Sequence, residues 1–431
     1  MLDFAPGAPG IAPRWTSSAK SGVGTALSRH SPLWFTISHG VVNEVYFPRV
    51  DSACTRDFEL LVVGPDGYFS EEKRDCQSTT RQVEDGIPAF SVSNLSRDGR
   101  YRIEKHVISD PARPSLIQKV TFTPLVGSLA DYRVYALLAP HLVNAGMDNS
   151  AWIGEQRDIT LLYASGRSRY LALGSSLPWR SRSVGFVGVS DGYQQLSRNG
   201  RLNPQYQRAD DGNVALCAEI GFDGDNSVEL VVGFGQSETE AGANVGASLR
   251  EGWDRAFAGY CNNWHDWQQS LKPLDQPRSG AINAYRVSTA VLASHRAVDR
   301  PGAVVASLSI PWGPAKGDDD MGGYHLVWPR DLVETAGGFL AAGDEREALS
   351  ILEYLREVQL ASGRWAQNMW LDGRPYWRGV QMDECAFPIL LADLLRRKGV
   401  LDGTALGRYL PMIRRAAGYI VANGPGSRQD R

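Results

Sequence analysis

The sequence is poor in the features that mark redox, nucleotide-binding and metal-dependent proteins. Its 431 residues include only five cysteines, which are scattered and form no CxxC pair. We therefore expect reduced, packed thiols rather than a disulfide framework. The seven histidines form no HxxxH or HExxH pattern, and neither GxGxxG nor GxxxxGK[ST] is present. We expect no transition-metal site, no nucleotide chemistry and no cofactor.

Net charge and long apolar runs are also nearly absent. The 45 basic and 48 acidic side chains leave a net charge of -3, which offers no general affinity for nucleic acid or an anionic membrane. No window approaches about 18 consecutive apolar residues, so we expect no transmembrane helix. The first ten residues show neither the basic nor the apolar region of a secretory signal. We therefore expect a cytoplasmic protein.

The first half of the chain has the pattern of β-strands. Residues 58–63 are apolar and run into the turn Gly64-Pro65-Asp66-Gly67, and residues 101–107 alternate with period two. Further strand-like runs span 116–122, 132–138, 159–163, 170–173, 184–189, 214–220 and 228–234. Because no helical periodicity separates these runs, the pattern predicts a large antiparallel β-sandwich.

The periodicity changes near residue 237. Five aromatic side chains step by three or four residues, which predicts a helix packing an aromatic stripe on the sandwich: Trp253, Phe257, Tyr260, Trp264 and Trp267. A proline-bracketed stretch, Lys272–Pro277, then predicts a linker over 272–278. The expected domains are a sandwich domain over 1–271 and a helical domain over 279–431.

Helices dominate the sequence after the linker. We expect them at about 279–299, 330–343, 345–361, 383–398 and 405–422. Asp344 with Glu347 has the spacing of a capping box, Gly363 is a candidate stop, and Asp383 is a candidate cap of the next helix.

Two long loops between the helices, 307–331 and 363–384, are rich in tryptophan, glycine and aspartate. Five of the 12 tryptophans fall between Trp312 and Trp377. A pyranose has C–H faces that pack on aromatic rings, and its hydroxyls need oriented donors and acceptors. Arg330 and Asp331 could hydrogen-bond two neighbouring hydroxyls of one ring. The alternative is that the tryptophans belong to the core and Arg330–Asp331 is an ion pair at a helix start.

Three consecutive aspartates, 318–320, raise the question of a calcium site. A calcium loop alternates its ligands and ends in a bidentate Glu, a pattern that this run lacks. We expect a solvated turn.

Three stretches resemble glycoside hydrolase family 15, the bacterial glucoamylase and glucodextranase group, over nearly the whole chain. They are WTSSAKSGVGTAL, the loop VVASLSIPWG…GGYHLVWPRD, and PYWRGVQMDECAFPILLADLL. The resemblance implies an N-terminal super-β-sandwich joined to an (α/α)6 barrel. It also implies an exo-acting hydrolase that releases glucose from the non-reducing ends of an α-glucan or oligosaccharide with inversion.

The resemblance carries over to individual residues. Trp328, Arg330 and Asp331 match a W-x-R-D element whose Arg and Asp hold hydroxyls of the terminal glucose. Tyr324 matches an aromatic close to the anomeric centre. Trp377 and Asp383 match a W-x5-D pattern whose Trp lines the cleavage subsites. Weaker substrate-binding candidates are Trp312, Gln381 and Glu384.

The two catalytic carboxyls of an inverting enzyme have no match here. The resemblance places the general acid in a W-E-E element directly after a segment like Gly424–Arg431, and the base further along the barrel. We therefore expect a truncated chain with part of the barrel, inactive on its own, and name no catalytic residue. Glu384, which opens a helix, is expected to support the site rather than to replace a catalytic carboxyl, and Glu334 is expected to be structural.

Two other functions remain open. One is a non-catalytic carbohydrate-binding fragment or pseudoenzyme that keeps part of the glucose site. The other is a sandwich-plus-barrel glycoside phosphorylase, which would need a phosphate site that nothing in the sequence resembles. The linkage specificity, α-1,4, α-1,6 or trehalose, also stays open.

Overall fold

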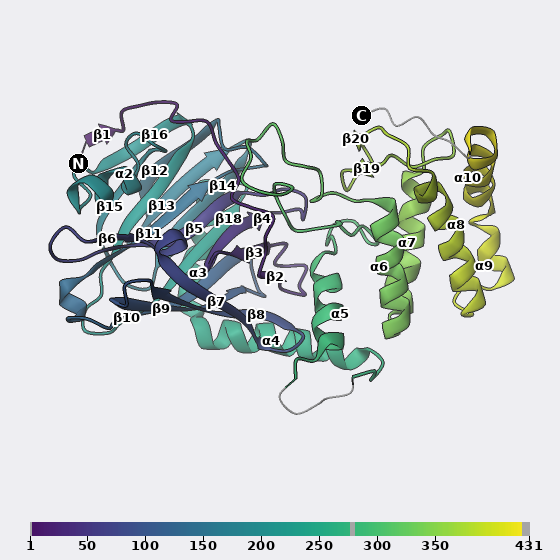
Figure 1. Cartoon of the computed structure of the whole chain (residues 1–431), viewed down its shortest axis with the longest axis horizontal. Coiled ribbons are helices and arrows are strands. Elements are labelled where there is room, and N and C mark those ends of the chain that lie inside the picture. Colours follow the sequence, from purple (N-terminus) through teal and green to yellow (C-terminus); the bar gives the residue numbers. More distant parts are fainter. Residues whose placement is uncertain (1, 276–280, 425–431) are drawn as a thin grey trace. The chain divides into compact units, whose positions relative to one another are not determined.

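A computed structural model describes residues 2–275 and 281–424 (Figure 1). The chain forms two compact units, each treated by itself below. The first contains residues 1–48, 52–265 and 313–321, and the second contains 49–51, 266–312 and 322–431. The predicted linker falls partly on 276–278, which lie outside the described residues.

The first unit is built on two large sheets, so the predicted β-sandwich is confirmed. One sheet has the strand order β1-β16-β12-β13-β14-β18-β10-β9-β8-β7, and the other has the order β15-β17-β11-β5-β4-β3-β2, with β6 beside β5. Neighbouring strands pair antiparallel, apart from the parallel pair β1 and β16. The first sheet contains β1 Leu2–Phe4, β7 Cys76–Glu84, β8 Ile87–Ser96, β9 Tyr101–Ser109, β10 Ser115–Pro124, β12 Asn149–Gln156, β13 Ile159–Gly166, β14 Arg169–Ser175, β16 Tyr206–Gly212 and β18 Ser227–Gly235. The second contains β2 Gly22–Thr25, β3 Trp34–Ser38, β4 Val41–Tyr46, β5 Thr55–Val63, β6 Phe69–Glu71, β11 Arg133–Pro140, β15 Trp179–Phe186 and β17 Val214–Ile220.

The core of the first unit lies between these sheets. Apolar side chains from both form one cluster, which includes Phe58 and Leu60 of β5, Val107 of β9 and Leu216 of β17. Burying each such side chain contributes about 1.5–3 kcal/mol, so this cluster is the main source of the unit's stability. A charged pair is also buried: Lys105 Nζ of β9 lies 2.8 Å from Glu72 Oε1.

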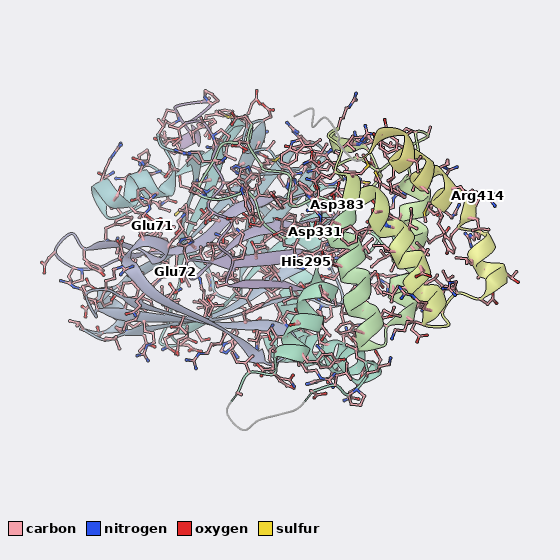
Figure 2. The ribbon with its side chains drawn as sticks, turned by 45° about the vertical axis from the view of Figure 1, so that its right-hand side comes forward. Glu71, Glu72, His295, Asp331, Asp383 and Arg414 are labelled. Atoms are coloured by element: carbon pink, nitrogen blue, oxygen red, sulfur yellow. The ribbon has the colours of Figure 1, made fainter. Side chains whose placement is uncertain are left out.

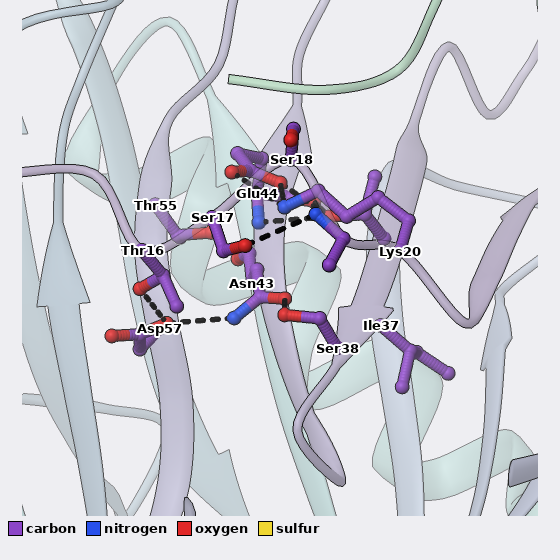
Figure 3. Close-up of polar contacts among 12 residues, drawn as sticks. Thr16, Ser17, Ser18, Lys20, Ile37, Ser38, Asn43, Glu44, Thr55 and Asp57 are labelled. Carbon is purple, nitrogen blue, oxygen red and sulfur yellow. Dashed lines mark hydrogen bonds and ion pairs between the residues drawn. The ribbon is translucent and has the colours of Figure 1, made fainter. Parts of the chain in front are cut away.

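Buried polar contacts fix the N-terminal segment that carries the first motif (Figure 3). Thr16 donates from its hydroxyl to Asp57 Oδ1 at 2.7 Å, and Asn43 Nδ2 donates to the same oxygen at 2.7 Å. Lys20 Nζ lies 2.7 Å from Glu44 Oε2, a side chain with no exposure. This motif is therefore structural in the first unit.

The predicted helix over 237–271 is two helices, α3 Glu238–Glu251 and α4 Trp253–Ser270. They are separated by Gly252, whose φ of +77° favours glycine and interrupts the helical backbone. The predicted packing of the aromatic stripe is confirmed for Tyr260 and Trp264: the Tyr260 hydroxyl donates to Pro88 O at 2.9 Å, and Trp264 Nε1 donates to Thr25 O at 3.0 Å. Two short helices complete this unit, α1 Glu72–Asp75 and α2 Gly192–Asn199.

The segment 313–321 belongs to the first unit. Trp15 N donates to Lys316 O at 2.8 Å, and Gly146 N donates to Asp318 Oδ2 at 2.7 Å. Asp319 and Asp320 are exposed, as a solvated turn requires, but Asp318 is not: its Oδ1 lies 3.4 Å from buried His141 Nε2. The expectation of a solvated turn was therefore wrong for Asp318. Within residues 2–275 and 281–424, no three His, Cys, Asp or Glu side chains are grouped as a metal site would need.

The second unit is helical, with a small hairpin of two strands. Its elements are α5 Ala284–Ser294, α6 Pro329–Ala342, α7 Glu345–Val358, β19 Asn368–Met369, β20 Pro375–Trp377, α8 Met382–Arg397, α9 Gly403–Gly407 and α10 Leu410–Asn423. Buried side chains on its helices include Phe339, Leu352, Leu391 and Met412. Over the described part of the chain, no helix combines the length and apolar character needed to cross a membrane.

The helix boundaries confirm some predicted caps and correct others. Asp344 Oδ1 accepts from Glu347 N at 3.1 Å, so Asp344 caps α7 as predicted. Gly363 is not the stop of α7, which ends at Val358; it has a φ of +97° in the loop that follows. Asp383 is not a cap either. Gln381 holds the N-cap position of α8, and Asp383 lies in the first helical turn.

Candidate functional site

Three aromatic rings form a stack before α6. Trp312 and Tyr324 have ring centroids 4.3 Å apart at 26°, and Tyr324 and Trp328 have centroids 5.1 Å apart at 16°. Trp377 meets Trp328 edge to face, at 5.6 Å and 90°. The structure therefore brings the predicted residues Tyr324, Trp328 and Trp377 together, and Trp312 extends the group.

Two consecutive glycines allow the loop to approach these rings. Gly322 and Gly323 have φ values of +78° and +70°, a conformation that costs other residues energy. A Cβ on Gly322 would lie 2.5 Å from Trp312 Cβ, and one on Gly323 would lie 2.7 Å from Asn368 Nδ2. The backbone here can take its path only because both side chains are missing.

The predicted polar residues meet at the first turns of α6 and α8. Arg330 Nε donates to Asp383 Oδ2 at 2.7 Å, and Arg330 Nη2 donates to Gln381 Oε1 at 2.6 Å. The hydrogen bond from Arg330 is the main cause that lowers the pKa of Asp383, so this carboxylate stays ionised. Arg330 therefore pairs with Asp383 across two helices, and the alternative of an Arg330–Asp331 ion pair at a helix start was wrong.

Asp331 is half-buried beside this pair, and burial raises the pKa of its carboxyl. Figure 2 labels both carboxylates, Asp331 at the start of α6 and Asp383 at the start of α8. The two carboxyls therefore differ in burial and in their partners: burial raises the pKa of Asp331, whereas the hydrogen bond from Arg330 lowers the pKa of Asp383.

Glu384 is the most deeply buried acid of this group. The residue is 1% exposed, and neither carboxyl oxygen has a hydrogen-bond partner among the described residues. Burial raises the pKa of Glu384 to about 9; the charge of Arg330 opposes this rise, and the charges of Asp383 and Asp331 add to it. Glu384 therefore carries its proton at neutral pH. Glu334, in contrast, is exposed on α6.

The five tryptophans of the two loops divide between core and surface. Trp365 is 1% exposed and donates from Nε1 to Leu355 O at 2.9 Å, and Trp328 is 5% exposed. Trp312 and Trp377 are 58% and 38% exposed. The core explanation therefore holds for Trp328 and Trp365, Trp370 is partly buried, and Trp312 and Trp377 are open to a ligand.

Two buried polar residues of the site had no signal in the sequence. Asn368 Oδ1 accepts from Trp377 N at 2.7 Å, and Asn368 Nδ2 donates to Gly323 O at 3.3 Å, so this side chain joins the two loops. His325 is fully buried, and burial lowers its pKa to about 3, which keeps the ring neutral. The only sequence signal for Asn368 is its position in the tryptophan-rich second loop, two residues before Trp370.

Comparison with known proteins matches both units to families. Residues 5–269 match the family described as glucodextranase, domain N, and residues 282–366 match glycosyl hydrolases family 15. A glucoamylase of Clostridium sp. (strain G0005) is 36% identical over 423 residues, which cover 98% of this chain and 58% of the relative. The crystal structure of a bacterial glucoamylase complexed with acarbose superposes with a TM-score of 0.92 at 34% identity, covering 99% of this chain and 61% of that chain.

The chain thus spans about three fifths of the length of the relatives it matches. Its first unit is the N-terminal β-sheet domain of this group, and its helical unit corresponds to part of an (α/α)6 barrel. The chain belongs to the glucoamylase and glucodextranase group of glycoside hydrolase family 15, with an N-terminal glucodextranase domain and part of a family 15 domain.

Proposed function

We propose that the helical unit binds the non-reducing terminal glucose of an α-glucan, as part of an exo-acting glucan hydrolase that inverts configuration. The bonds from Arg330 to Asp383 and Gln381, next to the aromatic stack, are the observation that supports this most directly. A charged, oriented donor beside exposed indole rings suits a ligand that has both hydroxyls and C–H faces.

Arg330 keeps donors for a sugar after making these bonds. A guanidinium has five N–H groups, and within the described residues the contacts of Arg330 use Nε and Nη2. Nη1 is then available to a hydroxyl, and the carboxylates of Asp331 and Asp383 supply acceptors. Trp377 supplies exposed apolar surface at the same site, and the other two aromatic candidates, Tyr324 and Trp328, support it from within the stack.

We propose that residues 1–431 bind sugar without hydrolysing it. An inverting hydrolase needs a protonated carboxyl and a carboxylate about 6.5–9.5 Å apart, with the sugar and a water between them. Glu384 is protonated, but its 1% exposure keeps it from reaching a glycosidic oxygen. Asp383, the residue just before Glu384, is ionised and already pairs with Arg330. This pair does not provide the two opposed carboxyls.

The test is a calorimetric titration of the purified 431-residue chain with maltose and with isomaltose, which also compares the two linkages. We expect binding in the unaltered chain and its loss in Arg330→Ala. The matched control is Arg396→Ala, because Arg396 also forms a surface pair with an aspartate, Asp393, at 2.8 Å. Unchanged binding in Arg330→Ala would contradict the proposed site, and release of glucose from maltooligosaccharides would contradict the proposed lack of hydrolysis.

A further inference from the structure

The most exposed ring of the site is that of Trp312. Its side chain is 58% exposed, against 38% for Trp377 and 5% for Trp328. A single exposed aromatic side chain is common, but exposed rings that group together beside polar side chains can mark a ligand-binding surface, and Trp312 is stacked in such a group. The face of Trp312 toward Tyr324 is covered, since their centroids are only 4.3 Å apart.

The order of the stack decides which ring faces are open. Tyr324 is stacked on Trp312 and also on Trp328, so both of its faces are covered. Trp328 is covered by Tyr324 on one side and meets Trp377 at 90°. A pyranose therefore cannot lie flat on Tyr324. The open stacking surface of this aromatic row is the outer face of Trp312, at the end away from Trp328.

Trp312 is held in place rather than loosely attached. The backbone at Gly322 passes so close that an added Cβ would lie 2.5 Å from Trp312 Cβ and 2.8 Å from Trp312 N. The ring is also stacked on Tyr324, whose own neighbour Trp328 donates from Nε1 to Gly323 O at 3.1 Å. A platform that is already ordered loses little conformational freedom when a ligand binds.

We infer that the outer face of Trp312 binds a glucose unit beyond the terminal one, so that Trp312 makes the site prefer oligosaccharides to glucose. This inference rests on the proposed function, which places the terminal unit at Arg330, near Trp328. Two stacking steps, of 4.3 and 5.1 Å, separate the Trp312 and Trp328 rings. A single pyranose at Arg330 leaves the outer face of Trp312 empty, whereas a longer chain can cover it.

The experiment compares the dissociation constants of glucose, maltose and maltotetraose for the purified 431-residue chain and for Trp312→Ala. Loss of one aromatic stacking contact should weaken maltotetraose binding about five- to tenfold and glucose binding less than about twofold. Trp312→Phe, which keeps a ring, should recover part of the loss. Gly322→Ala, which displaces Trp312 without removing it, should show the same selective loss as Trp312→Ala.

The matched control is Trp152→Ala, because Trp152 also stacks on a tyrosine, Tyr163, at 5.6 Å and 10° but lies in the sandwich unit. It should leave all three constants unchanged. Equal weakening of glucose and maltotetraose by Trp312→Ala, or no weakening of either, would overturn the inference. If Trp312→Ala weakens neither sugar but glucose binding still depends on Arg330, the proposed function stands although the inference about Trp312 is wrong. No binding of any sugar by the unaltered chain would overturn both.

Discussion

Arg330 and Asp383 form an ion pair between the first turns of α6 and α8, with Nε and Oδ2 2.7 Å apart. The two residues are separated by 53 positions in the sequence, and the long tryptophan-rich loop lies between them. The pair brings the ends of that loop together, so the W-x-R-D and W-x5-D elements become one polar group.

Asp383→Asn should separate the binding role of this pair from its structural role. The pair is partly exposed, with side-chain exposures of 36% and 47%, so its loss should cost no more than about 1 kcal/mol of unfolding free energy. Maltose binding should weaken at least about tenfold, because an uncharged amide releases Arg330 and loses a charge-assisted acceptor. Urea unfolding and calorimetric titration measure the two effects. A variant that loses stability but binds normally would assign the pair a structural role alone.

Glu384→Gln should flatten the pH dependence of stability. Because the folded-state pKa of about 9 lies above the ordinary value of 4.5, the folded chain keeps a proton that the unfolded chain releases. Glu384 therefore destabilises the fold progressively as the pH rises from about 4.5 to 9, by up to roughly 1.4 kcal/mol per pH unit. Urea unfolding at pH 5, 7 and 9 should show a smaller decline in Glu384→Gln. Glu334→Gln, on the exposed side of α6, should follow the unaltered chain, and parallel curves for all three proteins would contradict the burial of Glu384.

Gly323→Ala and Gly337→Ala should change stability in opposite directions. Gly323 has a φ of +70°, and a Cβ there would lie 2.7 Å from Asn368 Nδ2, so alanine should cost about 1–3 kcal/mol. Gly337 lies inside α6, and its added Cβ would meet nothing within 4 Å. Alanine at this position should stabilise the helix by about 0.5–1 kcal/mol. Thermal unfolding of the two variants provides the measurement, and a shift of the same sign in both would be inconsistent with this backbone geometry.

Lys105→Met should strongly destabilise the sandwich unit. The side chains of Lys105 and Glu72 are 2% and 0% exposed, and their charged atoms are 2.8 Å apart. Removing Lys105 leaves Glu72 buried without its counter-charge, with hydrogen bonds only from Leu60 N and Asn94 Nδ2 among the described residues, and such a loss costs about 3–5 kcal/mol. Lys119→Met is the control, because Lys119 is 39% exposed and lies 3.7 Å from an exposed Asp254. A comparable loss in both variants would indicate that burial of the charge is not the cause.

Periodic patterns predicted most of the fold, because they reflect burial directly. The apolar run over residues 58–63 lies inside β5, and the alternating run over 101–107 lies inside β9. The strand β7 was missed since its side chains are mostly exposed and polar, so it shows no apolar alternation. The break at Gly252 was missed because one glycine hardly interrupts an aromatic stripe, although its φ of +77° ends a helix.

The site was predictable in its composition but not in its pairings. The sequence elements identify Arg330, Asp331 and Asp383 and suggest the neighbouring pair Arg330–Asp331, whereas the structure forms the distant pair Arg330–Asp383. Such pairings depend on which helix N-termini lie next to each other in the folded chain, and the local sequence does not indicate this. The buried proton of Glu384 likewise arises from tertiary packing, since an isolated glutamate at a helix start would be solvated and ionised.

The placement of residues 313–321 in the sandwich unit has a consequence for the order of folding. Arg14 Nη2 donates to Ala315 O across 301 positions, and Gly146 N donates to Asp318 Oδ2 across 172 positions. Contacts this distant form slowly, because a long loop must close before they contribute any stability. During synthesis, the strands of both sheets are made before Asp318, the partner of His141 and Gly146. The sandwich is therefore finished only after a part of the helical unit has already been made.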